Sequence, residues 1–510
     1  MKTASPRSVR DNRSLRRWRL RLPELHGADL LKLTPQAVTM LAVGALVAVQ
    51  PLAAAASVGA GALVLLAAKH QVALAVTMTL IWGLLAAYLF MGRGFAYLGV
   101  PPVYAGEAVL MVGLVGLIVS RGQHPLTAMH IVLGAFMLWG AARTIPFIAT
   151  YGLDAFRDAV TWGYAAFAIV ISRLVRLLDV ERLIGWYGRL VPIVVVWVPV
   201  IGVAWLAARA SFPMVPGTDV QVPYFKAGDF AVHLAGAGAF VLVGLYPRTH
   251  LRRLTEPLLW AAWLVGFSVL SALNRGGMLA MLAATSTVLI FVRSFARWLA
   301  VLLTGLLLLS VVAAANLEVD VGRDRDLSLG QVIQNLTSVV GDTGDPGLAG
   351  TREWREQWWS EIVGYTFSGP YFWDGKGYGV NLAEADGFLG VQFPELRAPH
   401  NAHVQFLARS GVPGFALWVT TQLAFAGTML LSAQRCARSG RRRWLALHAW
   451  ILAYWIAAIV NMTFDVYLEG PQGGIVFWSL IGLGLGVVAL ARETDRDLDQ
   501  PADTVELPRA

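Results

Sequence analysis

Long apolar stretches separated by short polar segments run through most of the 510-residue chain. A helix needs roughly 20 predominantly apolar residues to cross the ~30 Å of hydrocarbon in a bilayer. The pattern therefore predicts fourteen membrane-spanning helices, at residues 36–53, 54–68, 71–91, 104–120, 126–142, 157–172, 190–208, 228–246, 257–272, 277–292, 298–315, 411–432, 444–462 and 473–491. Pro51 divides the first apolar region. If residues 36–68 form one hairpin or a single bent helix instead of two spans, the number of spans falls to twelve or thirteen.

The composition supports this interpretation, because 56% of the residues are hydrophobic and only 14% are charged. Soluble domains carry roughly a quarter charged residues. The sequence thus predicts an all-α fold, a polytopic transmembrane bundle of 12–14 spans. Its expected parts are a basic arm (1–35), the first eleven spans (36–315), a large, partly helical loop (316–410), the last three spans (411–491) and a tail (492–510).

The distribution of Lys and Arg indicates the orientation of the chain. Basic residues accumulate in cytoplasmic loops of membrane proteins. Placing the N-terminus in the cytoplasm puts 28 of the 41 Lys and Arg residues on that side, and the alternation holds at every predicted turn. Both termini are therefore expected in the cytoplasm, and the loop 316–410 on the outer face of the membrane.

The formal net charge of +9 is accounted for by this cytoplasmic surface and gives no indication of nucleic-acid binding. The Arg-rich arm within residues 1–35 is suited to anionic membrane lipids. Cys436 is the single cysteine, so no disulfide or CxxC metal site follows from the sequence.

The most informative motif is His400-Asn401, at the point where the large outer loop re-enters the membrane. His400 follows Pro399, and with an ordinary pKa near 6.5 its imidazole would suit proton transfer at neutral pH. Asn401 and His403 beside it are candidates for the lining of a substrate cavity. The alternative is that the two histidines only cap and polarise an interfacial helix.

Four arginines are expected on the same side of the membrane as His400: Arg157, Arg275, Arg352 and Arg355. Guanidinium groups match the oxygens of a phosphate. Snorkelling to the interface, or pairing with neighbours such as Asp158 and Glu356, is the alternative for each of them.

Lys226, Asp229 and His233 have the spacing i, i+3 and i+7 at the start of the eighth predicted span, and so they share one helix face. They either line a polar cavity or form a structural ion pair within the bundle.

Two further motifs carry less information. Asp324-Arg325-Asp326 has the DxD form of a metal site but is diluted by arginines, and no metal ligand set is predicted. Gly375-Lys376-Gly377-Tyr378-Gly379 lacks the spacing of a nucleotide-binding loop, so a turn is expected there.

The chain resembles the O-antigen ligases and the related O-antigen polymerases of bacteria. His400-Asn401 followed by Gly411 and Gly414 matches the family pattern His-[Asn/Ser/Gln]-x9-Gly-x-x-[Gly/Thr/Tyr]. The resemblance extends over residues 260–430 and includes Asn274-Arg275-Gly276-Gly277, where the family more often has Ser before the Arg, and the Trp- and Arg-containing stretch before the Gly-rich turn.

This resemblance implies an inverting, metal-independent glycosyl transfer without a cofactor, from an undecaprenyl-diphosphate-linked glycan. The acceptor would be a lipid-A core sugar for a ligase, or a second lipid-linked glycan for a polymerase. His400 would correspond to the proposed general base, and Arg275 with Arg352 or Arg355 to the arginines that bind the diphosphate; Arg157 is our addition. A transporter or flippase of lipid-linked glycans is the competing class, although transporters usually show repeated halves that are not evident in this chain.

Overall fold

The computed structural model describes residues 70–246, 252–291, 346–389 and 396–499, with the short segments 319–320 and 326–327. All of them belong to one compact unit, Gly44–Ala510. The predicted spans 36–53, 54–68 and 298–315, the basic arm, and Asp324 and Arg325 of the DxD motif lie outside the described residues, as does the side chain of Arg352.

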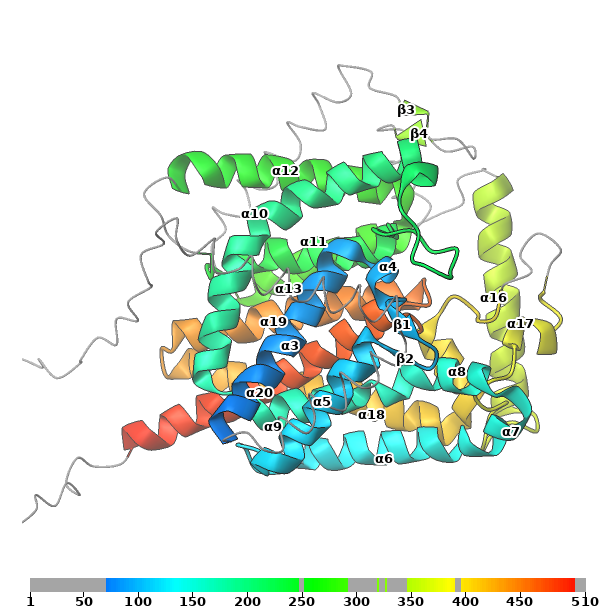
Figure 1. Ribbon diagram of the computed structural model, residues 1–510, viewed down its shortest axis with the longest axis horizontal. Coiled ribbons are helices and arrows are strands. Elements are labelled where there is room, and N and C mark those ends of the chain that lie inside the picture. Colours follow the sequence, from blue (N-terminus) through cyan, green and yellow to red (C-terminus); the bar gives the residue numbers. More distant parts are fainter. Residues whose placement is uncertain are drawn as a thin grey trace, which may run out of the picture. The chain divides into compact units, whose positions relative to one another are not determined.

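The described chain is helical apart from two short hairpins, β1–β2 and β3–β4 (Figure 1). The elements are α3 (His70–Met91), α4 (Arg93–Ala96), β1 (Gly99–Val100), β2 (Val103–Tyr104), α5 (Ala105–Ser120), α6 (Ala128–Ala142), η2 (Ile145–Phe147), α7 (Ile148–Tyr151), α8 (Leu153–Gly163), α9 (Ala165–Leu174), α10 (Leu177–Ala208), η3 (Arg209–Ser211), α11 (Ala227–Leu242), α12 (Arg252–Leu273), α13 (Arg275–Phe291), β3 (Val319–Asp320), β4 (Asp326–Leu327), α16 (Pro346–Phe367), α17 (Leu382–Ala385), α18 (Ala402–Arg438), α19 (Arg442–Thr463) and α20 (Pro471–Asp499).

Seven helices in the described part of the chain are long and apolar enough to cross a membrane. They are His70–Met91, Ala128–Tyr151, Leu177–Ser211, Thr255–Leu273, Ala402–Arg438, Arg442–Thr463 and Pro471–Thr494. Four shorter apolar helices accompany them: Ala105–Ser120, Ala165–Leu174, Ala227–Leu242 and Arg275–Phe291. The predicted all-α polytopic bundle is confirmed.

Helix α20 is the centre of the bundle. Its apolar window is 94% buried, whereas that of the helix Ala128–Tyr151 is only 22% buried. It packs against α9, α18 and α19 (Figure 1). Gly482 and Gly484 allow this close approach, because a Cβ atom would lie 2.8 Å from the Ala168 carbonyl oxygen at the first position and 2.7 Å from the Phe425 ring at the second.

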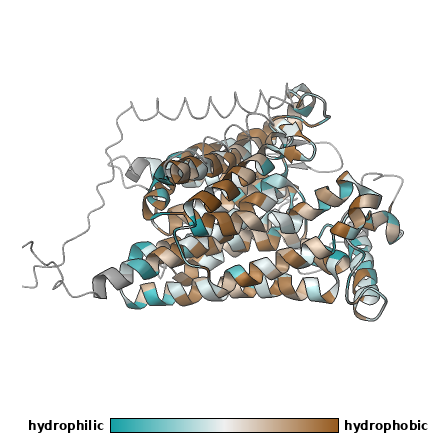
Figure 2. Cartoon of the chain, turned by 60° about the horizontal axis from the view of Figure 1, so that its bottom comes forward, coloured by the Kyte–Doolittle hydropathy of each residue, from teal (hydrophilic) through white to brown (hydrophobic). Residues whose placement is uncertain are grey.

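Large apolar side chains are exposed along single faces of the outer helices. Ile131 and Leu138 of α6 lie seven residues apart and are 73% and 74% exposed, and Leu423 and Leu430 of α18 repeat this spacing. Seven residues are two turns, so each pair lies on one face of its helix. Figure 2 shows apolar residues along most of the bundle, and these exposed faces are suited to contact with lipid.

Three helices differ from the boundaries expected from hydropathy. The apolar segment 157–172 is divided between α8 and α9 at Tyr164, α10 begins at Leu177 instead of near residue 190, and α18 begins at Ala402 instead of near residue 411. The early start of α10 is stabilised by Asp179, which accepts hydrogen bonds from the backbone and side chain of Arg176. A helix can thus continue through charged residues where a hydropathy window ends.

Residues assigned to one side of the membrane contact one another in the structure. At the expected cytoplasmic side, His124 contacts Glu493 and the Arg441 guanidinium donates to the Ala491 carbonyl. At the expected outer side, Arg143 pairs with Asp374. These three contacts each join segments that the charge pattern assigns to one side of the membrane, and the orientation itself stays a prediction.

Candidate active site

The His400-Asn401 motif forms the beginning of α18. The Asn401 side-chain oxygen accepts hydrogen bonds from the backbone N–H groups of His403 and Val404, at 3.0 and 3.1 Å. Asn is one of the strongest N-cap residues, since its oxygen satisfies N–H groups that have no partner within the helix. Asn401 therefore fixes the residue at which the helix starts and leaves His400 immediately outside it.

The backbone of His400 is in the left-handed region, with φ 53°. This conformation is uncommon for residues other than glycine. The Pro399 carbonyl beside it accepts a hydrogen bond from the Trp359 indole of α16 at 2.7 Å. The backbone on either side of His400 is thus held by the N-cap and by α16.

The two glycines of the motif shape the middle of α18. Gly411 has φ 66° and ψ −172°, which interrupts the helix. Pro413 has no N–H group, so the Arg409 carbonyl cannot have its usual helical donor four residues on. Val412 donates to the Phe372 carbonyl at 2.8 Å instead of continuing the helix.

The Gly-rich turn 375–379 satisfies the carbonyl groups that this kink releases. Lys376 N–H donates to the Ala408 carbonyl at 2.7 Å and Gly377 N–H to the Arg409 carbonyl at 3.0 Å. Gly375, Gly377 and Gly379 all have positive φ angles, so the predicted turn is confirmed. The large loop is therefore attached to the same helix that carries the histidine motif.

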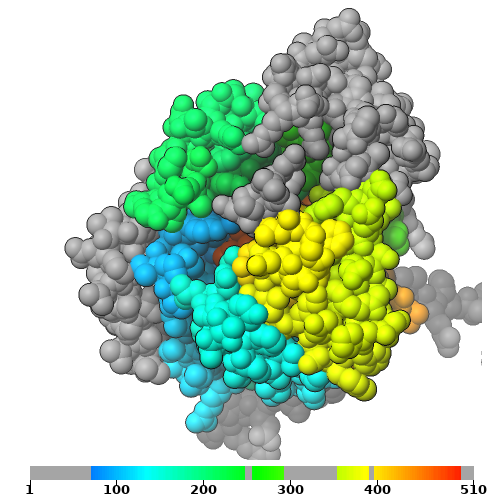
Figure 3. Space-filling view, turned by 90° about the vertical axis from the view of Figure 1, so that its right-hand side faces the viewer, coloured from blue at the N-terminus to red at the C-terminus, as the bar shows by residue number. Residues whose placement is uncertain are grey.

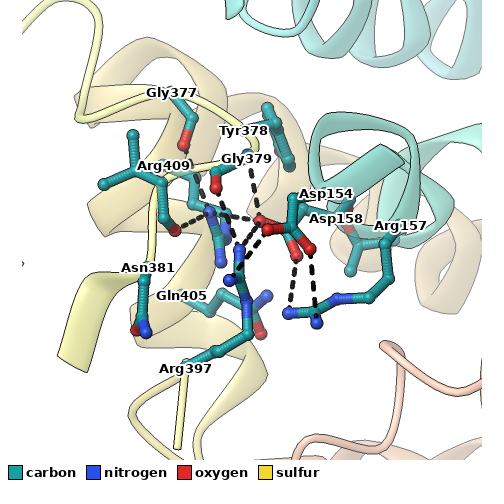
Figure 4. Close-up of polar contacts among 12 residues, drawn as sticks. Asp154, Arg157, Asp158, Gly377, Tyr378, Gly379, Asn381, Arg397, Gln405 and Arg409 are labelled. Carbon is teal, nitrogen blue, oxygen red and sulfur yellow. Dashed lines mark hydrogen bonds and ion pairs between the residues drawn. The ribbon is translucent and has the colours of Figure 1, made fainter. Parts of the chain in front are cut away.

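Asp158 of α8 connects these parts through buried contacts (Figure 4). Its carboxylate forms an ion pair with the Arg409 guanidinium and accepts a hydrogen bond from the Gly379 N–H group, each at 2.9 Å. Arg397 lies 3.6 Å away and Arg157 3.4 Å away. Asp158 and Arg409 are almost fully buried, with side-chain exposures of 2% and 1%.

A cavity of about 740 Å³ lies between α4, the β1–β2 hairpin, α8, the segment 396–400 and the turn before α20. Figure 3 shows this hollow bordered by blue, cyan and yellow segments. Its polar lining includes Arg93, Tyr97, Tyr104, Glu107, Asp154, Arg157, Tyr164, Lys226, Asn381, Arg397, His400, Glu469 and Gln472. The lining thus holds four basic side chains, Arg93, Arg157, Lys226 and Arg397, beside three acidic ones, Glu107, Asp154 and Glu469, and the basic groups offer contacts to an anionic ligand.

His400 lines this cavity and is half-buried. The pKa of its imidazole is lowered to about 4, first by burial and then by the positive charges of Arg355 and Lys226, while Asp465 opposes the shift. The expectation of an ordinary pKa near 6.5 is wrong, because the loop encloses the ring and two cations act on it. At neutral pH the ring is in its neutral form, able to accept a proton.

The triplet Lys226, Asp229 and His233 does not act as one group. Lys226 lines the cavity and pairs with Asp465 at 2.8 Å and with Asp229 at 3.7 Å. Asp229 is buried and also accepts from Gln472 at 3.0 Å. The structural ion pair is therefore present, and only its lysine lines the cavity.

His233 lies deeper in the bundle. Its Nδ1 atom contacts the Tyr454 hydroxyl at 2.5 Å. Both residues line a separate, mostly apolar pocket of about 90 Å³, whose lining also includes Trp82, Tyr187 and Trp450.

Arg355 and Gly276, the residue after Arg275, approach the same backbone turn. Arg355 donates to the Phe464 carbonyl at 3.5 Å. Arg275 begins α13, and a Cβ atom added at the next residue, Gly276, would lie 2.8 Å from the Cβ atom of Phe464. Asn274 caps α13 by accepting from Gly277 N–H at 2.6 Å, a role that Ser can also fill. Arg275 is half-buried but does not line the cavity.

His403 is also placed outside the cavity lining. Its Nδ1 atom accepts from the Trp418 indole at 3.1 Å within α18. Asn401 serves as the helix cap. Arg157 lines the cavity, paired with Asp154 and Asp158.

Sequence reasoning missed several residues of this region: Arg93, Arg397, Asp465, Glu469 and Gln472. Arg93 had a usable signal, since it is a lone arginine in a short outer loop between two apolar segments. The acidic and amide groups follow α19, in a turn that hydropathy treats only as a connection.

The fold and this cavity define a polytopic helical membrane protein with a cationic site bordered by a histidine. Residues 260–419 match the family model described as O-antigen ligase, which confirms the resemblance of this region to that family. No curated protein matches the chain. The match covers α13, α16 and the first half of α18, including the histidine motif, and it supports a membrane enzyme of the O-antigen ligase or polymerase type.

Proposed function

We propose that this protein transfers a glycan from undecaprenyl diphosphate to an acceptor hydroxyl at the outer face of the inner membrane. The observation that carries the proposal is the position of His400, which borders a cavity lined by four cationic side chains within the region that matches the O-antigen ligase family. The expected orientation, with cytoplasmic termini and the loop 316–410 outside, gives this cavity access to lipid-linked substrates of the outer leaflet.

In the proposed step, the acceptor oxygen forms a bond to the anomeric carbon while the bond from that carbon to the diphosphate oxygen breaks. The hydroxyl proton passes to the neutral ring of His400, and undecaprenyl diphosphate leaves with both bonding electrons. Direct displacement inverts the anomeric configuration. General-base catalysis of this kind contributes about 10²–10⁴-fold to the rate.

Guanidinium groups stabilise the diphosphate leaving group in this mechanism. Negative charge develops on the diphosphate as the sugar departs, and fixed cationic donors stabilise it most effectively where water is excluded. Arg355 is a preferred donor because it acts electrostatically on His400, and Arg275 because the resemblance maps it onto a diphosphate-binding arginine; both lie outside the cavity lining, so they would act beside its four cations. Arg352 and Arg157 are further candidates, and the mechanism requires neither a metal nor a cofactor.

The charges around His400 couple base strength to donor binding. Arg355 and Lys226 keep its pKa low in the absence of substrate. A bound diphosphate would offset these cations and raise the pKa of the ring, which makes it a stronger base when the donor is in place. The carboxylate of Asp465 already acts to raise the pKa of the ring.

The acceptor is either a lipid-A core sugar or a second lipid-linked glycan, and both reactions use the same donor chemistry. Transport of a lipid-linked glycan is the competing function and leaves the masses of donor and acceptor unchanged.

The test incubates purified protein with a lipid-diphosphate-linked glycan and each candidate acceptor, followed by mass analysis of the products. Ligation and polymerisation give products of different mass. His400→Ala is expected to fold and insert normally and to lose about 10²–10⁴-fold in transfer rate. His403→Ala is the matched control, because His403 lies one turn further along α18, outside the cavity lining. Full activity of His400→Ala, or equal losses in both variants, contradicts the mechanism.

A further inference from the structure

Arg93 differs from the other cations that line the cavity. Arg157, Lys226 and Arg397 each have carboxylate partners within ion-pair distance. Among the described residues no carboxylate lies within ion-pair distance of Arg93. Asp229 is the one described carboxylate that acts electrostatically on it, from a longer distance. Its guanidinium is therefore the cavity cation whose charge is least neutralised by the described part of the protein.

Aromatic groups hold this guanidinium in place. Arg93 Nη2 donates to the Tyr97 hydroxyl at 2.6 Å, and the guanidinium carbon lies 5.3 Å from the Tyr97 ring centre and 5.8 Å from that of Tyr224. Such contacts restrict an arginine without neutralising it. The remaining donors of the planar group stay available to a ligand.

The backbone before Arg93 is shaped to present it at the cavity. Helix α3 ends at Met91, and Gly92 has φ 57°. A Cβ atom at Gly92 would lie 2.4 Å from the Tyr224 carbonyl oxygen, so only glycine permits this contact between the chain segments. Tyr224 N–H donates in turn to the Met91 carbonyl at 3.0 Å. Arg93 begins α4 directly after this turn.

We propose that Arg93 binds an anionic group of the substrate, either a phosphate or a carboxylate, at a site distinct from that of Arg275 and Arg355. This inference rests on the proposed function. The group belongs either to the diphosphate of the lipid carrier or to an acidic sugar of a glycan. A bidentate contact with a guanidinium fork suits both, since each presents paired oxygens. Tyr97 and Tyr104, with ring centres 6.0 Å apart, provide apolar surface beside the anion site.

The test measures binding to purified full-length protein in nanodiscs with two probes, undecaprenyl diphosphate and glucose 6-phosphate, with glucose as the uncharged reference. Arg93→Gln is expected to weaken at least one charged probe about 10- to 100-fold, the size of a lost charge-assisted hydrogen bond. Arg93→Lys keeps the charge but not the fork and should recover part of the affinity. Tyr97→Phe, which loses only the hydroxyl that orients Arg93, should give a smaller loss.

Arg209→Gln is the matched control, since Arg209 is an exposed arginine expected on the same side and does not line the cavity. Weaker binding of undecaprenyl diphosphate to Arg93→Gln identifies the carrier as the source of the anion. Weaker binding of glucose 6-phosphate alone identifies a glycan. Unchanged binding of both probes, or an equal loss in Arg209→Gln, overturns the inference while His400-dependent transfer can still stand. Wild-type protein that binds neither probe overturns the proposed function as well.

Discussion

Asp158→Asn tests how the site is held together. The substitution keeps an oxygen that can accept from Gly379 N–H but removes the negative charge opposite the buried Arg409 guanidinium. Breaking a buried ion pair by changing one partner costs about 3–5 kcal/mol. Because Asn retains one hydrogen bond, we expect a loss near 3 kcal/mol in the free energy of unfolding.

The matched control is Asp154→Asn on the same helix. Asp154 pairs with Arg397 at 3.1 Å and with Arg157 at 3.6 Å, but its side chain is 44% exposed. Exposed pairs contribute about 0.2–1 kcal/mol, so this variant should be close to wild type. The two variants remove the same charge from neighbouring turns of α8.

The free energies are measured by unfolding the protein in mixed micelles of dodecyl maltoside and SDS, followed by tryptophan fluorescence. Arg409→Gln should cost about as much as Asp158→Asn, and the double variant should cost less than the sum, because the two residues are in direct contact. If Asp158→Asn and Asp154→Asn differ by less than about 1 kcal/mol, or if the double variant is additive, the buried pair does not hold the loop on α18.

Two further predictions concern His400 and the kink of α18. Because the His400 pKa is about 4, its ring stays unprotonated as the pH falls from 8 to about 5.5. The contribution of His400 to kcat/KM should therefore be constant over this range and should fall only as the pH approaches 4. A tenfold fall in kcat/KM centred near pH 6.5 would contradict the lowered pKa of His400. Gly411→Ala should destabilise the protein by about 1–3 kcal/mol, since φ is 66° and the added Cβ would lie 2.6 Å from the Phe372 carbonyl oxygen. Gly427→Ala, with no atom within 4 Å of its added Cβ, should be neutral or stabilising in the same unfolding assay, and equal effects of the two would refute the strain argument.

Hydropathy predicted the helical bundle, because lipid contact requires apolar faces and backbone groups that are satisfied within each helix. The same reasoning selected His400, Arg157 and Lys226, which line one cavity in the structure. It worked for these residues because charges at the ends of spans are costly unless they have a partner or a function.

The remaining features of the site depend on packing between distant segments. The shorter of the two ion pairs of Lys226 is with Asp465, from a turn 239 residues further along the chain. The pKa of His400 depends on how far the loop encloses it, and the separation of His233 from Lys226 depends on the depth at which α11 packs. The spacing of residues within one helix predicts which of them share a face. It cannot predict which distant segments pack against that face.

The central position of α20 has a consequence for biosynthesis. The ribosome completes this helix after the other six described spans, yet its apolar window is the most enclosed of the seven. The earlier segments must therefore wait in the translocon or the lipid, with their inner faces uncovered, until α20 is inserted. A nascent chain that stops before residue 471 lacks the helix around which the others assemble, so truncated products should be recognised by membrane proteases even though every residue of the histidine motif has been translated.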